Sequence, residues 1–396
     1  MPPRPHPLAR ARLVDRLNRW LDSAWRKNVL PYPSLAPADL MASGMRGFTV
    51  EDEAGGRDAE DVADFRERLN ILCASLENEA RLNPLGRTVA HGQLVRVIRQ
   101  RFALGRLWRN EPTRTNTQIA PPIIVVGQMR SGTTRIHRLL AADPAHCGTR
   151  FCDSWHPVPE RIDLRPLWSG FALFMGRRLD PWLDTLHPFG AARVDEELGW
   201  LAAALDHCAY EAQWHVPTFT AFSEARDPVP VYREFDRILR TDASRRRNAN
   251  LPRVLKVPQF AEDLSAILQQ FPKARLVVAR RDTADVVRSS ASLVTNQMTI
   301  QSDDVDIDWI DREWERKIAL RAERMERALA GFDGPVAQLD FDALGRDWRS
   351  EVARTYEALD LVLTPEALEA MQSEQARASG GSHERHARDL RAFAEA

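Results

Sequence analysis

The segment "PPIIVVGQMRSGTTRIHRLLAADP", residues 121–144, decides the fold class. It begins with a short run of β-branched apolar residues, continues with a loop bounded by two glycines, and ends with apolar residues at helical spacing. A buried strand, a loop and a helix in this order form a phosphate-binding loop, in which backbone amides hold the anion. The triphosphate pattern G-x-x-x-x-G-K-[ST] places a lysine after the second glycine, but the residue there is Thr133.

The charge and hydroxyl groups of the loop indicate which phosphate compound it binds. A cation occurs earlier in the loop, and it is followed by hydroxyl residues and a glycine: Arg130, Ser131, Gly132, Thr133 and Thr134. The missing lysine would neutralise the β- and γ-phosphates of a triphosphate. A ligand with one 5′-phosphate and no triphosphate tail needs only amides, hydroxyls and a nearby cation. We expect the helix to begin at Thr133 or Thr134, so that its positive end faces the anion.

Three further short apolar runs predict the rest of a sheet. They lie at residues 253–257, 274–280 and 335–341, with helical patterns between them. Continuous apolar strands that alternate with helices are typical of a parallel sheet covered on both faces. We therefore predict a three-layer α/β/α, P-loop-like fold for residues 116–396.

The first part of the chain, residues 1–115, shows no strand signal and is predicted to be all-helical. Helical spacing occurs at residues 9–28, from residue 64 onward and at residues 90–107, whereas the turn-rich residues 31–58 suggest a connecting loop. The helix at 9–28 is basic and amphipathic. We expect it to pack on its own domain, which leaves at most a peripheral contact with a membrane.

Composition excludes several classes of protein. The 396 residues include 55 basic and 56 acidic side chains, so no overall field recruits nucleic acid. The four cysteines lack the paired spacing of a zinc site, and we expect reduced thiols, no metal and a cytoplasmic location. No apolar run reaches the length of a membrane span.

A second candidate anion site follows a later strand. In "ARLVVARRDTADVVRSSASLV", residues 274–294, Arg281 comes directly after the apolar run and a helix is expected to open near Thr283. Open α/β sheets bind ligands at the carboxyl ends of their strands, where Arg281 is expected. Ser289 follows two turns into the helix, on a face that can converge with Arg281.

These two segments resemble the donor site of the bacterial branch of the sulfotransferase family. "GQMRSGTT" is similar to the family's 5′-phosphosulfate loop, a basic residue followed by S-G-T-T. Arg281 and Ser289 match the 3′-phosphate motif R-[DN]-P-x-x-x-x-x-S, with Thr283 in place of the proline. The resemblance implies a metal-free enzyme whose donor cosubstrate is 3′-phosphoadenosine 5′-phosphosulfate. It implies that the donor is bound by Arg130, Ser131, Gly132, Thr133, Thr134, Arg281 and Ser289.

Other segments extend the resemblance over most of the chain. "LPRVLKVPQF" is similar to the family's L-K-S-P-x-H strand end, and "HPFGAARVDEE" to its H-P-x-G-A acidic segment. "GGSHERHARDL", residues 380–390, is similar to the family's last segment near the 3′-phosphate. By this resemblance, Lys256 is the expected cation on the leaving oxygen.

Sulfuryl transfer needs a base for the proton of the acceptor hydroxyl. Relatives use a histidine after the lysine-containing strand or an acid beyond the first loop. The histidine position is Phe260 here, so the expectation falls on Asp153, where relatives carry glutamate, with His187 second. The acids Asp195, Glu196 and Glu197 are further candidates, although three adjacent acids more often begin a solvated helix.

The acceptor is expected to be apolar. Large apolar side chains are concentrated in residues 166–189: Trp168, Phe171, Phe174, Met175, Trp182 and Phe189. We therefore expect a sulfotransferase that acts on a hydroxyl of a hydrophobic small molecule or lipid. The alternatives are a P-loop small-molecule kinase and a non-catalytic nucleotide-binding protein.

Overall fold

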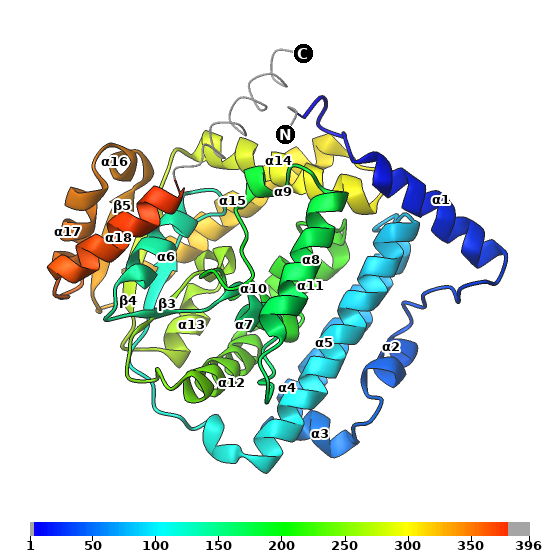
Figure 1. Cartoon of the computed structure of the whole chain (residues 1–396), viewed down its shortest axis with the longest axis horizontal. Helices are drawn as coiled ribbons and strands as arrows, with labels where there is room; N and C mark the ends of the chain where they lie inside the picture. The colour runs from blue at the N-terminus through cyan, green and yellow to red at the C-terminus, as the bar shows by residue number, and fades with distance from the viewer. Residues whose placement is uncertain (1–3, 379–396) are drawn as a thin grey trace.

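A computed structural model describes residues 4–378. At its centre lies a parallel sheet of five strands in the order β2-β3-β1-β4-β5 (Figure 1). The strands are β1 (Ile123–Val126), β2 (Cys147–Gly148), β3 (Arg253–Leu255), β4 (Arg275–Arg280) and β5 (Val336–Asp340). Four of them are the predicted strands. β2 was not predicted, because two residues are too short to show a periodic pattern.

Both faces of the sheet are buried, as the continuous apolar runs predicted. In β1, Ile123 and Val125 pack into the core on one face, while Ile124 and Val126 pack into the core on the other. Side chains alternate between the two faces of a strand, so a strand covered on both sides must be apolar at every position.

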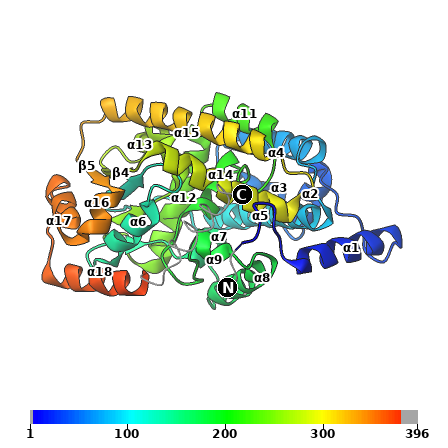
Figure 2. The ribbon, with the colours of Figure 1, turned by 90° about the horizontal axis from the view of Figure 1, so that it is seen from above.

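Helices cover each face and complete the predicted three layers. Figure 2 shows helices on the two opposite sides of the strands. One face packs against α12 (Val229–Arg246), α13 (Leu264–Gln270) and α15 (Ile307–Ala330). The other packs against α6 (Thr133–Ala142), α16 (Phe341–Arg346), α17 (Trp348–Ala358) and α18 (Pro365–Ala378). α14 (Thr283–Gln301) follows β4 and packs on α15.

The N-terminal region is helical, as expected, but the expected loop at residues 31–58 contains two short helices. The helices of this region are α1 (Arg12–Arg26), α2 (Pro37–Gly44), α3 (Val50–Ala54), α4 (Ala59–Asn78), α5 (Pro84–Asn110) and the 3₁₀ turn η1 (Pro112–Arg114). Proline at the first position starts α2. A capping box between Thr49 and Asp52 starts α3.

The long helix α5 joins this region to the sheet. Leu104 and Trp108 near its end belong to the same core cluster as Ile124 and Val126 of β1. At its other end, Leu85 packs with Val14 and Leu21 of α1. The helix at residues 9–28 therefore packs on its own protein, as expected.

The remaining helices lie between β2 and β4. They are α7 (Phe151–Trp155), α8 (Arg165–Leu179), α9 (Leu183–Leu186), α10 (Leu198–Ala203), α11 (Pro217–Ala225) and the 3₁₀ turns η2 (His207–Ala209) and η3 (Pro258–Ala261). From above, α8 and α9 lie on the opposite side of the molecule from α11 and α15 (Figure 2). Between residues 4 and 378, no helix is both long and apolar enough to cross a bilayer. The C-terminal segment 380–390 lies outside the described residues.

Candidate active site

The loop between β1 and α6 has the geometry of an anion cradle. Gly132 adopts φ +85°, and a Cβ added there would come within 2.2 Å of Phe341 Cδ2, so both conformation and space require glycine. No side chain caps α6, which begins at Thr133 as predicted. Among residues 4–378, no backbone carbonyl accepts a hydrogen bond from the amides of Thr133 and Thr134. These amides are therefore available to an anion at the helix N-terminus.

The structure brings the two sequence-predicted half-sites together through Arg130. Its Nε donates a hydrogen bond of 2.9 Å to the Ser289 hydroxyl. Arg281, directly after β4, donates from its Nη1 to the Arg130 carbonyl at 2.7 Å and stacks on the Phe341 ring. The Ser131 hydroxyl turns back into the loop and donates to the Gln128 carbonyl at 2.6 Å.

Positive charge accumulates here without a matching carboxylate. Within the described part of the chain, Arg130 has no acidic partner at ion-pair distance, and Arg281 has one partner, the half-exposed Asp285, at 3.9 Å. Burial, together with repulsion from Arg281, lowers the pKa of Arg130 to about 10. Two crowded cations beside free amides fit a ligand that carries phosphate groups.

A lysine reaches the same loop from the neighbouring strand. The Nζ of Lys256, just beyond β3, donates to the Thr134 hydroxyl at 3.0 Å and pairs with the Glu196 carboxylate. Its backbone amide donates to Glu197 Oε2 at 2.8 Å, which fixes the end of the strand. Glu197 is fully buried, and burial raises its pKa to about 8.

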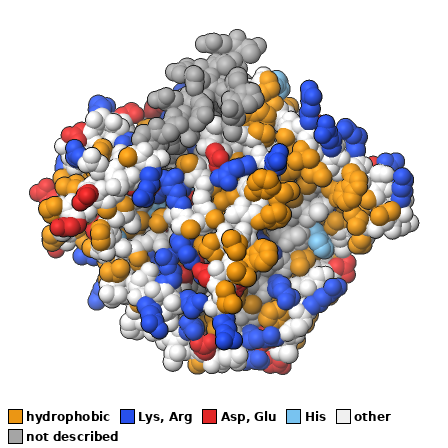
Figure 3. Space-filling model, in the orientation of Figure 1, with side chains coloured by type: hydrophobic (Ala, Val, Ile, Leu, Met, Phe, Trp, Pro, Cys, Tyr) orange, Lys and Arg blue, Asp and Glu red, His pale blue; other side chains and the backbone are white. Residues whose placement is uncertain are grey.

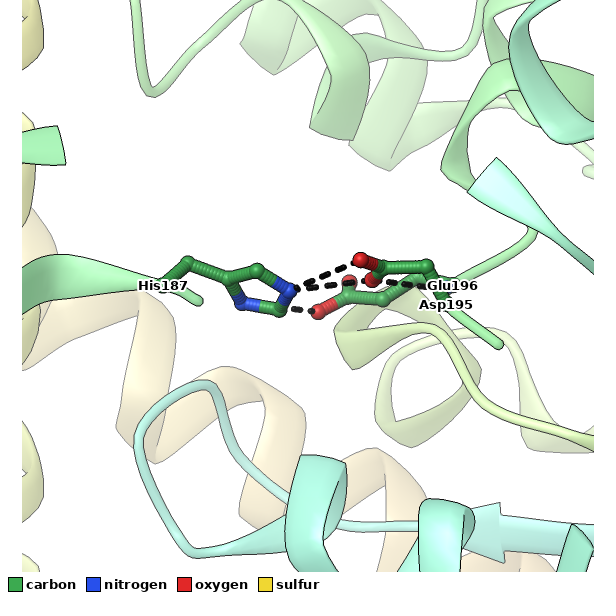
Figure 4. Close-up of side chains that lie close together, drawn as sticks. All are labelled: His187, Asp195 and Glu196. Carbon is green, nitrogen blue, oxygen red and sulfur yellow. Dashed lines mark hydrogen bonds and ion pairs between the residues drawn. The ribbon is translucent and has the colours of Figure 1, made fainter. Parts of the chain in front are cut away.

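His187 lies beside Asp195 and Glu196 (Figure 4), and Glu196 is the ion-pair partner of this lysine. Its Nε2 contacts Asp195 Oδ1 at 2.9 Å, and its Nδ1 lies 3.8 Å from Glu196 Oε1. Burial alone would raise the pKa of Asp195, but the charges of His187 and Arg138 outweigh it and hold that pKa below its usual range. When Nε2 carries the ring proton and donates it to Asp195, Nδ1 is the ring atom that can take up a further proton.

The donor atoms of this cluster lie within 4.8 Å of one another, a spacing that suits a metal ion as well as acid–base chemistry. However, Arg138 Nη2 lies 3.2 Å from Asp195, and Lys256 pairs with Glu196. Both carboxylates are therefore already neutralised by cations of the chain, and we interpret the cluster as an acid–base site.

Asp153, the first expected base, does not lie with the others. Its carboxylate accepts from Arg150 at 2.7 and 2.8 Å, and it pairs with Arg165 at 3.0 Å and Arg246 at 2.9 Å. It is 1% exposed and is not among the residues that line the cavity described below. Burial opposes ionisation, but the Arg150 hydrogen bonds and the other arginines lower its pKa. A carboxylate held in this way is suited to bind arginines, not to take a proton from a hydroxyl.

A cavity of about 900 Å³ opens beside these groups. Arg130, Lys256, His187 and Arg281 are among the residues that line it. The wall also includes Leu85, Val89, Gln93 and Arg96 of α5, Trp155 of α7, Trp168 and Ala172 of α8, and Phe189. The helical N-terminal region therefore forms part of the cavity wall.

The expected apolar pocket is only partly correct. Of the large side chains in residues 166–189, Trp168 and Phe189 line the cavity and Trp182 is buried. Phe171, Phe174 and Met175 instead point outward and are exposed. The helical spacing of α8 places them on the face turned away from the cavity.

Two residues that position the site were not assigned these roles from the sequence. Arg138 lies on α6 and holds Asp195, while Glu197 holds the Lys256 backbone. Arg138 is one of several arginines in its segment, and no spacing distinguishes it. Glu197 was one of three adjacent acids, and only its burial separates it from a solvated helix start.

The Sulfotransferase family model matches residues 121–365, which include the loop, both half-sites, Lys256 and the His187 cluster. The chain belongs to the sulfotransferase family. By sequence, no curated protein matches the chain. Of the residues assigned from the family's motifs, Arg130, Gly132, Thr133, Thr134, Lys256 and Arg281 line the cavity, whereas Ser131, Ser289 and Asp153 do not.

Solved structures agree with this membership. The chain is similar to sulfotransferase STF1 from Mycobacterium tuberculosis H37Rv, with 26% sequence identity and a TM-score of 0.74, over 85% of this chain and 92% of that chain. Sulfotransferase STF9 from Mycobacterium avium shares the fold, with 20% identity and a TM-score of 0.77, over 87% of this chain and 89% of that chain. The sulfotransferase α/β fold is thus the fold of this family member.

Proposed function

We propose that this sulfotransferase moves a sulfuryl group from 3′-phosphoadenosine 5′-phosphosulfate to a hydroxyl of a hydrophobic small molecule or lipid, without a metal ion. The observation that carries the proposal is the contact between Arg130 and Ser289, which joins the two phosphate half-sites beside a cavity that Arg130 and Arg281 line.

The donor is held by its two charged ends. The 5′-phosphosulfate is bound by the amides of Thr133 and Thr134, the Thr134 hydroxyl and Arg130. The 3′-phosphate is bound by Arg281 and Ser289. Gly132 fits this role because any side chain there would meet Phe341, the ring that supports Arg281. Ser131 shapes the loop through its hydrogen bond to Gln128.

His187 takes the acceptor proton in this proposal, in place of Asp153. His187 lines the cavity, and Asp195 fixes its ring through Nε2. As the acceptor oxygen bonds to sulfur, its proton passes to Nδ1 and the bond from sulfur to the 5′-phosphate oxygen breaks. The ammonium group of Lys256 stabilises the negative charge that develops on that oxygen, because it already lies at the Thr134 hydroxyl.

The walls of the cavity support an apolar acceptor. Trp155, Trp168, Phe189 and Leu183 line it, and about 900 Å³ is enough for a drug-sized molecule. Lys256 and His187 line the same cavity, so an acceptor bound in it can place its hydroxyl beside them for transfer.

The test is turnover with a panel of long-chain alcohols, sterols and phenols, followed by mass spectrometry. We expect a sulfated alcohol and an equal amount of 3′,5′-adenosine bisphosphate. ATP with magnesium serves as the competing donor. A phosphorylated product from ATP would contradict the proposal in favour of a kinase. Donor binding without transfer to any alcohol in the panel would favour a binding protein.

A further inference from the structure

Helix α8 presents an apolar face to solvent. Phe171 is 63% exposed and Leu167 is 68% exposed. With their neighbours they form a patch, which we call the α8 patch: Ile162, Leu164, Leu167, Trp168, Phe171, Phe174 and Met175. Figure 3 shows apolar side chains gathered over α8 on this face of the molecule. Contiguous exposed aromatic and aliphatic side chains mark a binding surface in a soluble fold.

The opposite edge of the same helix forms the cavity wall. Ser169, Ala172, Gly176 and Leu179 line the cavity, and Trp168 belongs to both the patch and the lining. One helix thus separates the cavity from the surface that the patch covers. A molecule that leaves this surface beside Trp168 reaches the cavity without crossing another layer of the protein.

Cations without acidic partners lie beside the patch. The outward face of α1 carries Arg12, Arg16 and Arg19 together with Trp20, and Lys27 follows the helix directly; all are exposed. Among residues 4–378 none of these four cations forms an ion pair, whereas Arg26 of the same helix pairs with Asp22. Figures 1 and 2 place α1 and α8 on the same side of the molecule, and the two helices are in contact.

We propose that this face docks on an anionic phospholipid bilayer. The α8 patch enters the boundary between headgroups and acyl chains, and the cations of α1 lie at the lipid phosphates. The acceptor is then a membrane-resident alcohol that passes from the bilayer into the cavity beside Trp168. This last step rests on the proposed function, whereas the docking does not.

The positive charge of this face favours an anionic bilayer as its partner over a second copy of the chain. In a two-fold interface built on this face, the same unpaired cations would meet one another, because symmetric interfaces bring identical surfaces together. An anionic bilayer instead offers a continuous negative surface to the basic face of α1. The packing of α1 on α5 leaves that face outward.

The test is flotation of the full chain with vesicles, in the absence of donor and acceptor. Vesicles of phosphatidylcholine with an equal part of phosphatidylglycerol should carry the protein, and vesicles of phosphatidylcholine alone should carry much less. Added salt should release it, because salt screens the attraction. Phe171→Ser with Phe174→Ser should lower the partition coefficient by about tenfold or more. Neither residue lines the cavity, so bisphosphate affinity should stay at the wild-type value.

Matched control variants distinguish binding through this surface from non-specific hydrophobic adsorption. Val50→Ser with Val362→Ser removes two other exposed apolar side chains and should leave flotation unchanged. Arg16→Glu should weaken flotation on anionic vesicles. Arg312→Glu should not, because this exposed residue belongs to α15, which lies across the molecule from α8 in Figure 2.

Three results would overturn the docking. The first is equal flotation of the Phe171/Phe174 variant and the wild type. The second is equal binding to neutral and anionic vesicles. The third is an absence of vesicle binding, together with light scattering that shows a dimer of the wild type and its loss in the variant.

Activity measurements test the acceptor separately. The variant should keep turnover on a short soluble alcohol and lose it on the same headgroup carried in vesicles. Loss of both activities with normal flotation would contradict the proposed function and not the docking.

Discussion

The Nε of Arg130 donates a hydrogen bond of 2.9 Å to the hydroxyl of Ser289, 159 residues further along the chain. Arg130 belongs to the loop after β1, and Ser289 belongs to the helix after β4. These two strands are neighbours in the sheet, so their carboxyl ends bring both anion-binding segments to one edge. The contact explains how one ligand can be held at two separated phosphates.

Replacing Arg281 tests the 3′-phosphate site. Arg281→Ala should weaken binding of 3′,5′-adenosine bisphosphate by about 1.5 to 3 kcal/mol, the contribution of a charged hydrogen bond. The variant should also lose its preference for the bisphosphate over 5′-AMP, which lacks the 3′-phosphate. Titration calorimetry with both nucleotides measures this preference.

The matched control is the adjacent Arg280, which pairs with Glu326 at the surface and does not line the cavity. Arg280→Ala should keep the preference for the bisphosphate. If the Arg281→Ala variant still prefers the bisphosphate to 5′-AMP, another group binds the 3′-phosphate.

His187 is expected to carry the acid–base step. His187→Ala should lower turnover by about 100-fold or more, the usual contribution of a positioned base, with bisphosphate affinity nearly unchanged. Added imidazole should restore part of the rate, because it replaces the missing ring. Steady-state kinetics with and without imidazole measures both effects.

Glu196 is the internal alternative, since its carboxylate also lines the cavity. A His187→Ala variant that keeps most of its turnover, together with a Glu196→Gln variant that loses it, would transfer the role of base to Glu196. We expect Glu196→Gln to act mainly through Lys256, its ion-pair partner.

Asp153 is expected to stabilise the fold. Asp153→Asn removes the charge shared by Arg150, Arg165 and Arg246, and should lower the free energy of unfolding by about 3 to 5 kcal/mol. Turnover per folded molecule should change little. Chemical denaturation and kinetics measure the two quantities.

Asp163 supplies the control, because it pairs with two of the same arginines but is partly exposed. Asp163→Asn should cost much less stability. Wild-type stability together with a 100-fold loss of turnover in Asp153→Asn would restore Asp153 as the base.

Glu197 makes stability depend on pH. Its pKa rises from 4.5 to about 8 on folding because it is buried. The folded state therefore holds its proton more tightly than the unfolded state. This contribution is fully present below about pH 4.5 and is lost as pH rises toward 8, by at most about 1.4 kcal/mol per pH unit.

Glu197→Gln cannot ionise and should remove that slope. Urea denaturation of both proteins across this pH range gives the difference in the free energy of unfolding. An unchanged slope in the variant would show that Glu197 is ionised in the folded protein.

Much of the fold could be predicted from the sequence because the strands are buried on both faces. Four apolar β-branched runs gave four strands, and the glycine-bounded loop gave the start of α6 at Thr133. The pattern failed where elements are short. β2 has two residues, and α2 and α3 are too short for a helical period to show among prolines and glycines.

The meeting of the two proposed phosphate half-sites could be anticipated from the sequence, because each follows a strand and its loop and spacing are local properties. The surroundings of the candidate bases could not. Local sequence does not distinguish Asp153 from His187, because what separates them is long-range packing. Arg246, 93 residues further along the chain, forms an ion pair with Asp153, whereas Asp195 orients the ring of His187, which lines the cavity.

The most direct test of the central claim is titration calorimetry of the wild-type protein with 3′,5′-adenosine bisphosphate and with ATP and magnesium. The paired cations Arg130 and Arg281, and the absence of a lysine at Thr133, predict that the bisphosphate binds well ahead of ATP. The bisphosphate should also raise the melting temperature, because a ligand bound only by the native state stabilises it. Equal or tighter binding of ATP with magnesium would contradict the account.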